Sequence, residues 1–104
     1  MKNKGIVLEA IDNYSLFNKN QKNILKALVN LSIDGEVITS IADLSQITNL
    51  VRATISSALS FLEKNEIIEV IRSRGIVFTG CKINQQKLNE IIIRYQTKKS
   101  LLTD

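Results

Sequence analysis

The sequence predicts a mainly α-helical domain with one small β-hairpin and an additional helix at its C-terminal end. Apolar residues recur at helical spacing in four stretches, and two β-branched runs flank a glycine-containing loop between the third and fourth stretches. The chain has 104 residues, of which 44% are hydrophobic and 23% are charged. This length suffices for one core and is too short for two, so we expect a single globular unit.

The first well-defined helix is expected over residues 18–32. Asn18 or Asn20 can serve as its N-cap, because either side chain can accept a hydrogen bond from the first turn. Asp34 and Gly35 end it with strong turn residues. The residues expected on its buried side are Ile24, Leu25, Leu28 and Leu31.

Two shorter helices joined by a tight turn are expected next. Ser40 can cap a helix over residues 41–47, and Asn49 ends it because asparagine tolerates a left-handed backbone. A further helix is expected over residues 51–64. The side chains expected to be buried are Ile41, Leu44 and Ile47 in the first of these helices and Ile55, Ala58, Leu59 and Leu62 in the second.

A β-hairpin and a last helix complete the pattern. The runs 67–71 and 76–79 are rich in β-branched residues and flank the polar loop 72–75, which predicts two antiparallel strands. Asn84 can cap the last helix, which we expect to fray near residues 98–99. Its apolar stripe consists of Leu88, Ile91, Ile92 and Tyr95. This stripe fits either a dimerisation face or packing on the same domain.

The predicted elements follow the plan of a winged helix-turn-helix domain. With a very short strand over residues 36–39, their order is helix, strand, helix, tight turn, helix, hairpin and helix. We assign residues 18–84 to this domain and residues 85–104 to a C-terminal helix and candidate dimerisation element. Residues 1–17 are interpreted as an N-terminal arm, because their short apolar segment 5–11 fits a helix and a strand equally well.

Positive charge is concentrated in the C-terminal third of the chain. The net charge is +4, composed of −1 over residues 1–69, with seven basic and eight acidic residues, and +5 over residues 70–104, with seven and two. Such an asymmetry favours an anionic partner, although a solvated basic face explains the charge alone equally well. Basic side chains of the hairpin region are expected to contact phosphates or the minor groove: Arg72, Arg74 and Lys82.

The helix over residues 51–64 has the features of a helix that contacts DNA bases. Arg52 is the one residue on it that can form two hydrogen bonds with guanine. Thr54 and Ser40, near helix N-termini, suit phosphate oxygens. The centre of its polar face carries small side chains, which let a helix approach the floor of the major groove: Ala53, Ser56, Ser57 and Ser60. A plain solvent-facing helix is the competing interpretation.

Residues 42–68 resemble the reading heads of bacterial winged-helix regulators of the GntR and MarR kinds. In those the pattern is a helix, a glycine turn, a recognition helix of the form SRxTVxRAL and a segment LExxGLI before the wing. The matching residues are Leu44, Arg52, Thr54, Ile55, Ala58, Leu59, Leu62, Glu63 and Ile68. The turn glycine is Asn49 here, the later glycine is Glu66, and a frequent second arginine is Ser56 or Ser57. The resemblance implies a stand-alone DNA-binding module of bacterial, phage or plasmid origin, without an effector domain.

Residues typical of catalytic and metal sites are scarce. The chain has no histidine and one cysteine, which is too few for a zinc site, a Cys/His nucleophile or an internal disulfide. Cys81 is expected to be a small buried hydrophobic residue. No apolar run is long enough to cross a membrane. We therefore expect a cytoplasmic protein that is not an enzyme and that uses no cofactor or metal.

The expected function is sequence-specific binding of double-stranded DNA by a transcriptional regulator of the repressor type. A homodimer on a pseudo-palindromic site is the expected assembly. One alternative is a replication or plasmid-maintenance initiator module, and another is a winged helix used only for protein–protein contact. Whether the binding site lies at a promoter or an origin distinguishes the first two, and the salt dependence of DNA binding distinguishes both from the third.

Overall fold

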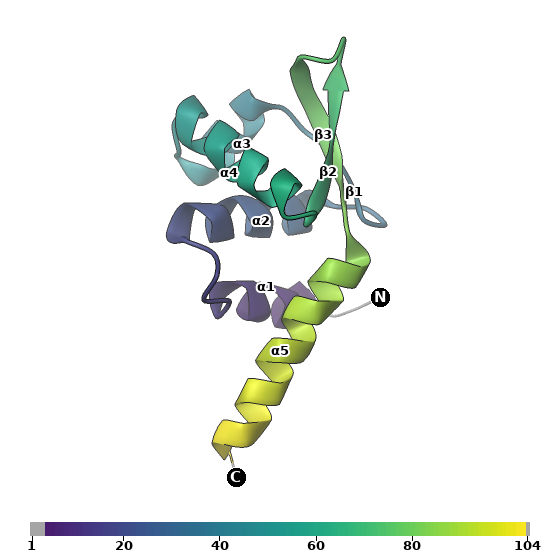
Figure 1. Cartoon of the computed structure of the whole chain (residues 1–104). Helices are drawn as coiled ribbons and strands as arrows, with labels where there is room; N and C mark the ends of the chain where they lie inside the picture. Colours follow the sequence, from purple (N-terminus) through teal and green to yellow (C-terminus); the bar gives the residue numbers. More distant parts are fainter. Residues whose placement is uncertain (1–3, 104) are drawn as a thin grey trace.

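The computed structural model describes residues 4–103, which form five α-helices and three β-strands (Figure 1). The predicted fold class is confirmed to the extent that the chain is mainly helical with a small antiparallel sheet, which is compatible with a winged helix. The helices are α1 (Lys4–Asp12), α2 (Lys19–Leu31), α3 (Ile41–Thr48), α4 (Arg52–Lys64) and α5 (Gln85–Thr103). The strands are β1 (Glu36–Ile38), β2 (Ile68–Ser73) and β3 (Val77–Ile83).

The three strands form one antiparallel sheet in the order β1-β3-β2. The predicted hairpin is therefore present, and the short strand β1 pairs with its second strand, β3. Val37 lies opposite Cys81, and Cys81 lies opposite Val70, so one row crosses all three strands. Val37 and Cys81 are fully buried in the core, which confirms the prediction for the cysteine.

Gly80 allows β1 to approach β3 at a point where the hairpin register shifts. Ile71 pairs with Gly80 and Arg72 pairs with Phe78, so Thr79 is the extra residue of a β-bulge. A Cβ atom on Gly80 would lie 2.2 Å from the carbonyl oxygen of Val37, in a backbone with φ of 157°. Only glycine fits this close approach.

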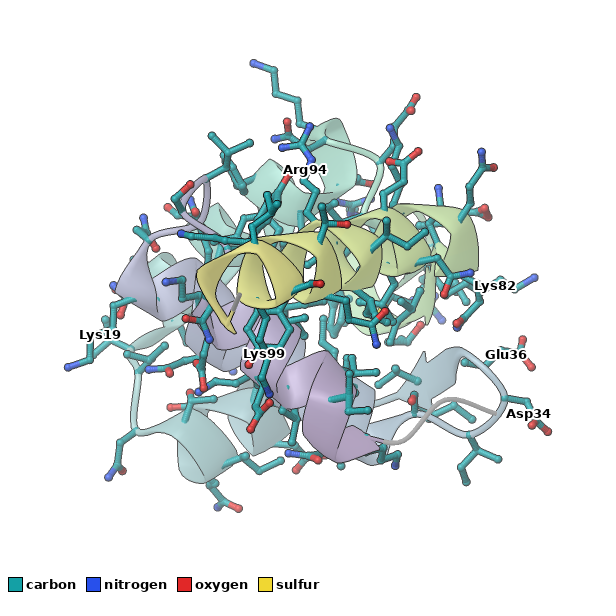
Figure 2. All side chains as sticks on the ribbon, turned by 90° about the horizontal axis from the view of Figure 1, so that it is seen from below. Lys19, Asp34, Glu36, Lys82, Arg94 and Lys99 are labelled. Atoms are coloured by element: carbon teal, nitrogen blue, oxygen red, sulfur yellow. The ribbon has the colours of Figure 1, made fainter. Side chains whose placement is uncertain are left out.

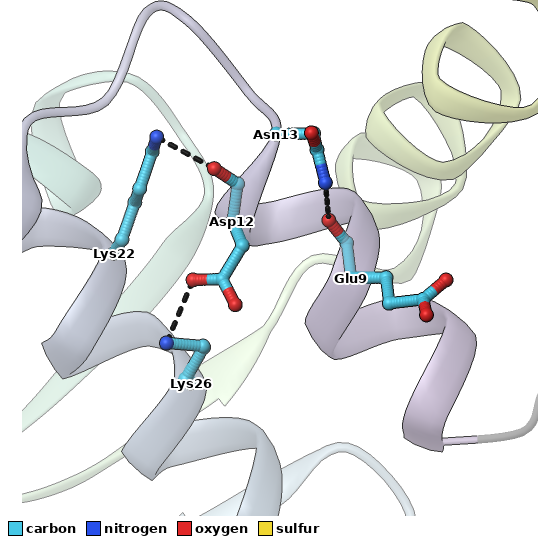
Figure 3. Close-up of polar contacts among 5 residues, drawn as sticks. All are labelled: Glu9, Asp12, Asn13, Lys22 and Lys26. Carbon is cyan, nitrogen blue, oxygen red and sulfur yellow. Dashed lines mark hydrogen bonds and ion pairs between the residues drawn. The ribbon is translucent and has the colours of Figure 1, made fainter. Parts of the chain in front are cut away.

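The predicted N-terminal arm is wrong for the described part of residues 1–17, because α1 is a core helix. Its C-terminal end is tied to α2 (Figure 3): Lys26 forms an ion pair with the Asp12 carboxylate at 2.7 Å, and Lys22 donates to the Asp12 carbonyl at 2.7 Å. The buried residues of α1 are Val7, Ala10 and Ile11. Residues 1–3 of the predicted arm lie outside the described residues.

Helix α5 starts as predicted and continues beyond its predicted end. The side chain of Asn84 accepts hydrogen bonds from the N–H groups of Gln86 and Lys87, at 3.1 and 3.2 Å. The fraying expected near residues 98–99 is absent, and the helix runs to Thr103 because no glycine or proline interrupts it. Its last turns extend beyond the rest of the molecule, at the end opposite the hairpin tip (Figure 1). Residue 104 lies outside the described residues.

Most of the predicted core is confirmed, with two corrections. The predicted stripe of α4 is buried, and so is Leu44 of α3, whereas Ile41 is half-buried. The predicted stripe of α2 is buried except for its last member. Leu31 and Ile47 are exposed. Both lie in the last turn of a helix. The helical period places them in line with the buried residues, but no other part of the described chain covers them there.

Candidate nucleic-acid interface

Helices α3 and α4 are joined by a short turn whose geometry is set by local hydrogen bonds. The Ser40 hydroxyl accepts from the N–H of Asp43 at 3.0 Å, which confirms the predicted N-cap of α3. Asn49 ends α3 in the left-handed region, with φ of 61° and ψ of 21°, as predicted from its residue type. The angle between the two helices is therefore established within a few residues.

Two hydroxyl groups hold the turn closed. Thr48 Oγ1 donates to the carbonyl of Leu44 at 2.6 Å and accepts from the N–H of Leu50 at 3.3 Å. Ser45 Oγ donates to the carbonyl of Leu50 at 2.8 Å. Because these bonds satisfy backbone groups that helix termination leaves open, the turn keeps α4 in a defined orientation on α2 and α3.

The two faces of α4 differ as the sequence indicates. The face with Ile55, Ala58, Leu59 and Leu62 is buried. Thr54 is half-buried, and the predicted contact residues of the other face are exposed: Arg52, Ala53, Ser56, Ser57 and Ser60. No side chain caps the start of α4, where Val51 occupies the N-cap position. The backbone N–H groups of the first turn of α4, which contains Arg52 and Thr54, therefore donate no hydrogen bond to a capping side chain.

The exposed face of α4 borders directly on the hairpin. A groove with a volume of about 320 Å³ runs between them. Helix α4 contributes Arg52, Ser56 and Ser60 to its wall, and the hairpin contributes Arg72, Ile76 and Phe78 among others. The structure thus places the predicted base-contacting helix next to Arg72 and Ile76, which lie on the two sides of the hairpin turn.

A second hollow, with a volume of about 310 Å³, lies between the start of α2 and α4. It is lined by Asn20 and Gln21 from α2 and by Thr54 and Ser57 from α4, among others. Gln21 is engaged with Asn18 in a reciprocal capping box, at 2.8 and 2.9 Å, so Asn20 is the freer amide. From the sequence Asn20 is expected only as a helix cap, although several amide side chains near it in the sequence indicate a polar surface.

Arg72 is not the free phosphate ligand that the sequence suggested. Its guanidinium forms two parallel hydrogen bonds with the Glu63 carboxylate, at 2.9 and 3.1 Å, and so joins β2 to the last turn of α4. These hydrogen bonds from Arg72 lower the pKa of Glu63 below its ordinary value. The sequence could not reveal the pairing, because the two residues are nine positions apart in different elements.

Arg74 occupies the turn of the hairpin. Its φ is 53°, that of Gly75 is 73°, and the N–H of Ile76 donates to the carbonyl of Ser73 at 3.1 Å. Two consecutive left-handed residues are characteristic of a type I′ turn, which suits the twist of a hairpin. Arg74 is exposed and forms no ion pair within residues 4–103. It is therefore the uncompensated positive charge of the hairpin turn.

Lys82 is not grouped with the other predicted phosphate ligands. It lies near the end of β3 that joins α5, and its strand partners are Glu36 on β1 and Glu69 on β2. Seen from below, Lys82 and Glu36 lie on the same side of the molecule (Figure 2). Because Lys82 has a glutamate opposite it on each neighbouring strand, it lies in a locally acidic part of the sheet.

The predicted dimerisation residues of α5 are used inside the chain. Leu88, Ile91 and Ile92 are buried, and α1 packs against this helix. The hydroxyl of Tyr95 donates to the Glu9 carboxylate of α1 at 3.0 Å. This corrects the dimer-face interpretation in favour of the alternative, packing on the same domain.

Comparison with known proteins assigns the chain to no family. No protein-family model matches the sequence, and no curated protein matches it. Within the described residues, no helix combines the length and apolar character needed to span a membrane.

Burial raises the pKa of the Cys81 thiol to about 11, so the thiol is protonated at neutral pH.

Proposed function

We propose that the chain is a winged helix-turn-helix protein that binds double-stranded DNA, with α3 and α4 as the helix-turn-helix and β2–β3 as the wing. The exposed face of α4 carries this proposal: it is made of small uncharged side chains, begins with Arg52 and borders the hairpin groove. Small side chains permit a helix to lie deep in the major groove. Figure 1 shows the hairpin beside α3 and α4, with its tip pointing away from α5.

Each side chain of the proposed interface has a role that follows from its chemistry. Arg52 contacts guanine, the Ala53 methyl group meets a thymine methyl group, and Ser56, Ser57 and Ser60 exchange hydrogen bonds with base edges. Thr54, Ser40 and the uncapped first turn of α4 contact phosphates. Arg74 contacts the backbone or the minor groove beside the site.

The charge of this face implies modest affinity and a shallow salt dependence. Arg72 is neutralised by Glu63, which leaves Arg52 on the wall of the groove and Arg74 at the hairpin turn as the cations of the proposed interface. Lys98 and Lys99 belong to the last turns of α5, which extend away from the hairpin (Figure 1). A duplex held by α4 and the hairpin therefore gains little from these two lysines, contrary to what the charge distribution of the sequence suggests.

Within this proposal the protein acts as a transcriptional regulator of the repressor type. A replication or plasmid-maintenance initiator module uses the same surface, and the genomic location of the binding site distinguishes the two. A homodimer remains part of the proposal, but its contact needs a surface other than the buried face of α5. Among the described side chains of α5, Ile93 in the middle of the helix and Leu101 near its end are exposed apolar residues.

Selection from random duplexes followed by binding measurements tests the proposed function. We expect one preferred sequence, bound more weakly when salt is raised from about 50 to about 200 mM. Arg52→Ala should relax the base preference, whereas Arg74→Ala should weaken binding to all sequences and reduce the salt slope by about one. Lys98→Ala, at the opposite end of the molecule, is the control and should change neither. Absence of binding at low salt, or an affinity that does not respond to salt, contradicts the proposal.

A further inference from the structure

The tip of the hairpin exposes apolar side chains in a segment whose charges are all positive. Ile76 is 81% exposed and Val77 is 59% exposed. From residue 70 to residue 89 the sequence contains basic residues and no aspartate or glutamate. A cluster of exposed apolar residues at the end of a projecting element, beside arginine, is a feature of interaction surfaces.

This tip is held in place by three interactions. The Thr79 hydroxyl donates to the carbonyl of Ile71 at 3.2 Å, across the hairpin. The turn itself is closed by the bond from Ile76 N–H to the Ser73 carbonyl. The Arg72–Glu63 pair then fastens β2 to α4. Ile76 is therefore presented at a set distance from the exposed face of α4, on the wall of the groove between them.

We propose that Ile76 is a wedge that enters the minor groove and partly unstacks a base step, while Arg74 contacts the flanking phosphates. The inference rests on the proposed DNA-binding function and adds a mechanism to it. Isoleucine is among the side chains that proteins insert between base steps, and this insertion kinks the duplex toward the major groove. The cost of unstacking is offset because a bent duplex contacts more protein surface than a straight one.

Charge decides between DNA and a second copy of the chain as the occupant of this tip. Two hairpin tips in contact would place Arg74 of one copy close to Arg74 of the other, and no acidic residue of the turn offsets this repulsion. A polyanion meets the arginine favourably, and the stacked bases provide the apolar surface that Ile76 needs.

Bending of a selected duplex tests the wedge. The duplex, of about 30 base pairs, carries donor and acceptor dyes at its ends and 2-aminopurine at the step facing the hairpin. The wild-type protein should bend it by on the order of 20–90° and raise the 2-aminopurine fluorescence. Ile76→Ala should bind but lose both signals. Arg74→Ala should bind more weakly at every salt concentration and keep the bend once the duplex is saturated.

Ile38→Ala is the matched control, because Ile38 is 93% exposed on β1 of the same sheet and away from the tip. It should bend DNA as the wild type does. A wild-type complex with straight DNA, or an Ile76→Ala complex that still bends it, overturns the wedge and leaves the proposed function standing. Failure of the wild type to bind any duplex overturns both. Self-association of the free protein that Ile76→Ala abolishes, with DNA bending unchanged, assigns the tip to a second copy and also overturns the wedge.

Discussion

The guanidinium of Arg72 lies 2.9 and 3.1 Å from the two carboxylate oxygens of Glu63, and this pair joins the hairpin to the last turn of α4. It gives the two proposed DNA-contacting elements a common frame, because each planar group fixes the orientation of the other. It also removes one positive charge from the surface that would meet phosphate. The pair thus supports the position of the hairpin at the expense of electrostatic affinity.

Replacing Glu63 should therefore strengthen DNA binding. We expect Glu63→Gln to free the Arg72 charge for phosphate and to steepen the slope of log affinity against log salt by about one. Glu66→Gln is the matched control, since it removes the same charge from a nearby exposed position without releasing an arginine. Fluorescence anisotropy with a labelled duplex at several salt concentrations measures both. Equal changes in the two variants would show that Arg72 makes no phosphate contact when freed.

The same pair makes part of the stability depend on pH. Hydrogen bonds from Arg72 lower the pKa of Glu63, so the pair stabilises the folded state at pH above the unfolded pKa of the glutamate. That contribution is lost as the pH falls through the lowered pKa of the folded state. The Tm difference between wild type and Glu63→Gln should be constant near neutral pH and shrink toward zero in acid. A difference that persists in strong acid contradicts the assignment of the pKa shift to this pair.

Gly80 and Gly75 should respond differently to a methyl group. Gly80→Ala forces a Cβ to within 2.2 Å of the Val37 carbonyl oxygen, so β1 must move, and we expect a loss of about 2–3 kcal/mol in the free energy of unfolding. Gly75→Ala meets no atom within 4 Å. Its cost should be that of a left-handed alanine, about 1 kcal/mol. Urea unfolding of both variants measures the difference. Equal losses of the free energy of unfolding would mean that the backbone angles, and not the contact with Val37, account for the cost.

Neighbouring isoleucines of α5 test whether this helix packs inside the chain. Ile92 is 1% exposed and Ile93 is 56% exposed. Ile92→Ala should lower the free energy of unfolding by about 2–5 kcal/mol, whereas Ile93→Ala should change it by less than about 0.5 kcal/mol. Sedimentation at several concentrations gives the oligomeric state of each. If Ile92→Ala dissociates a dimer while leaving the monomer stable, the apolar stripe of α5 that contains Leu88 and Ile92 is a dimer interface.

Cys81 should be unreactive while the protein is folded. Burial raises the pKa of its thiol to about 11, so no reactive thiolate forms at neutral pH. Alkylation by iodoacetamide, followed by mass spectrometry, should be negligible in buffer and complete in denaturant. Because the folded pKa is raised, this group favours the folded state fully below its unfolded pKa and loses that contribution as the pH rises toward 11. Rapid alkylation in buffer would mean that the sheet opens locally.

Local signals in the sequence determined most of the elements and the two faces of α4. The helix caps at Asn18 and Ser40, the left-handed Asn49 and the apolar stripe from Ile55 to Leu62 depend on interactions within about four residues along the chain. Such signals can be read without knowledge of the fold. The exposure of Arg52 and of the serines on α4 followed from the same periodicity.

Tertiary structure alone decided which of these residues meet. Residues 5–11 have no strong preference, and they become the helix α1 because α2 and α5 cover their apolar side. The partner of Tyr95 is Glu9, 86 positions earlier in the chain, and the partner of Arg72 is Glu63 in another element. Lys82 lies opposite two glutamates that only the strand register places beside it. Packing and pairing energies act between neighbours in space. Charge counted along the sequence therefore overstated the free positive charge of the hairpin. For the same reason, the apolar stripe of α5 did not by itself identify α1 as the helix that packs against it.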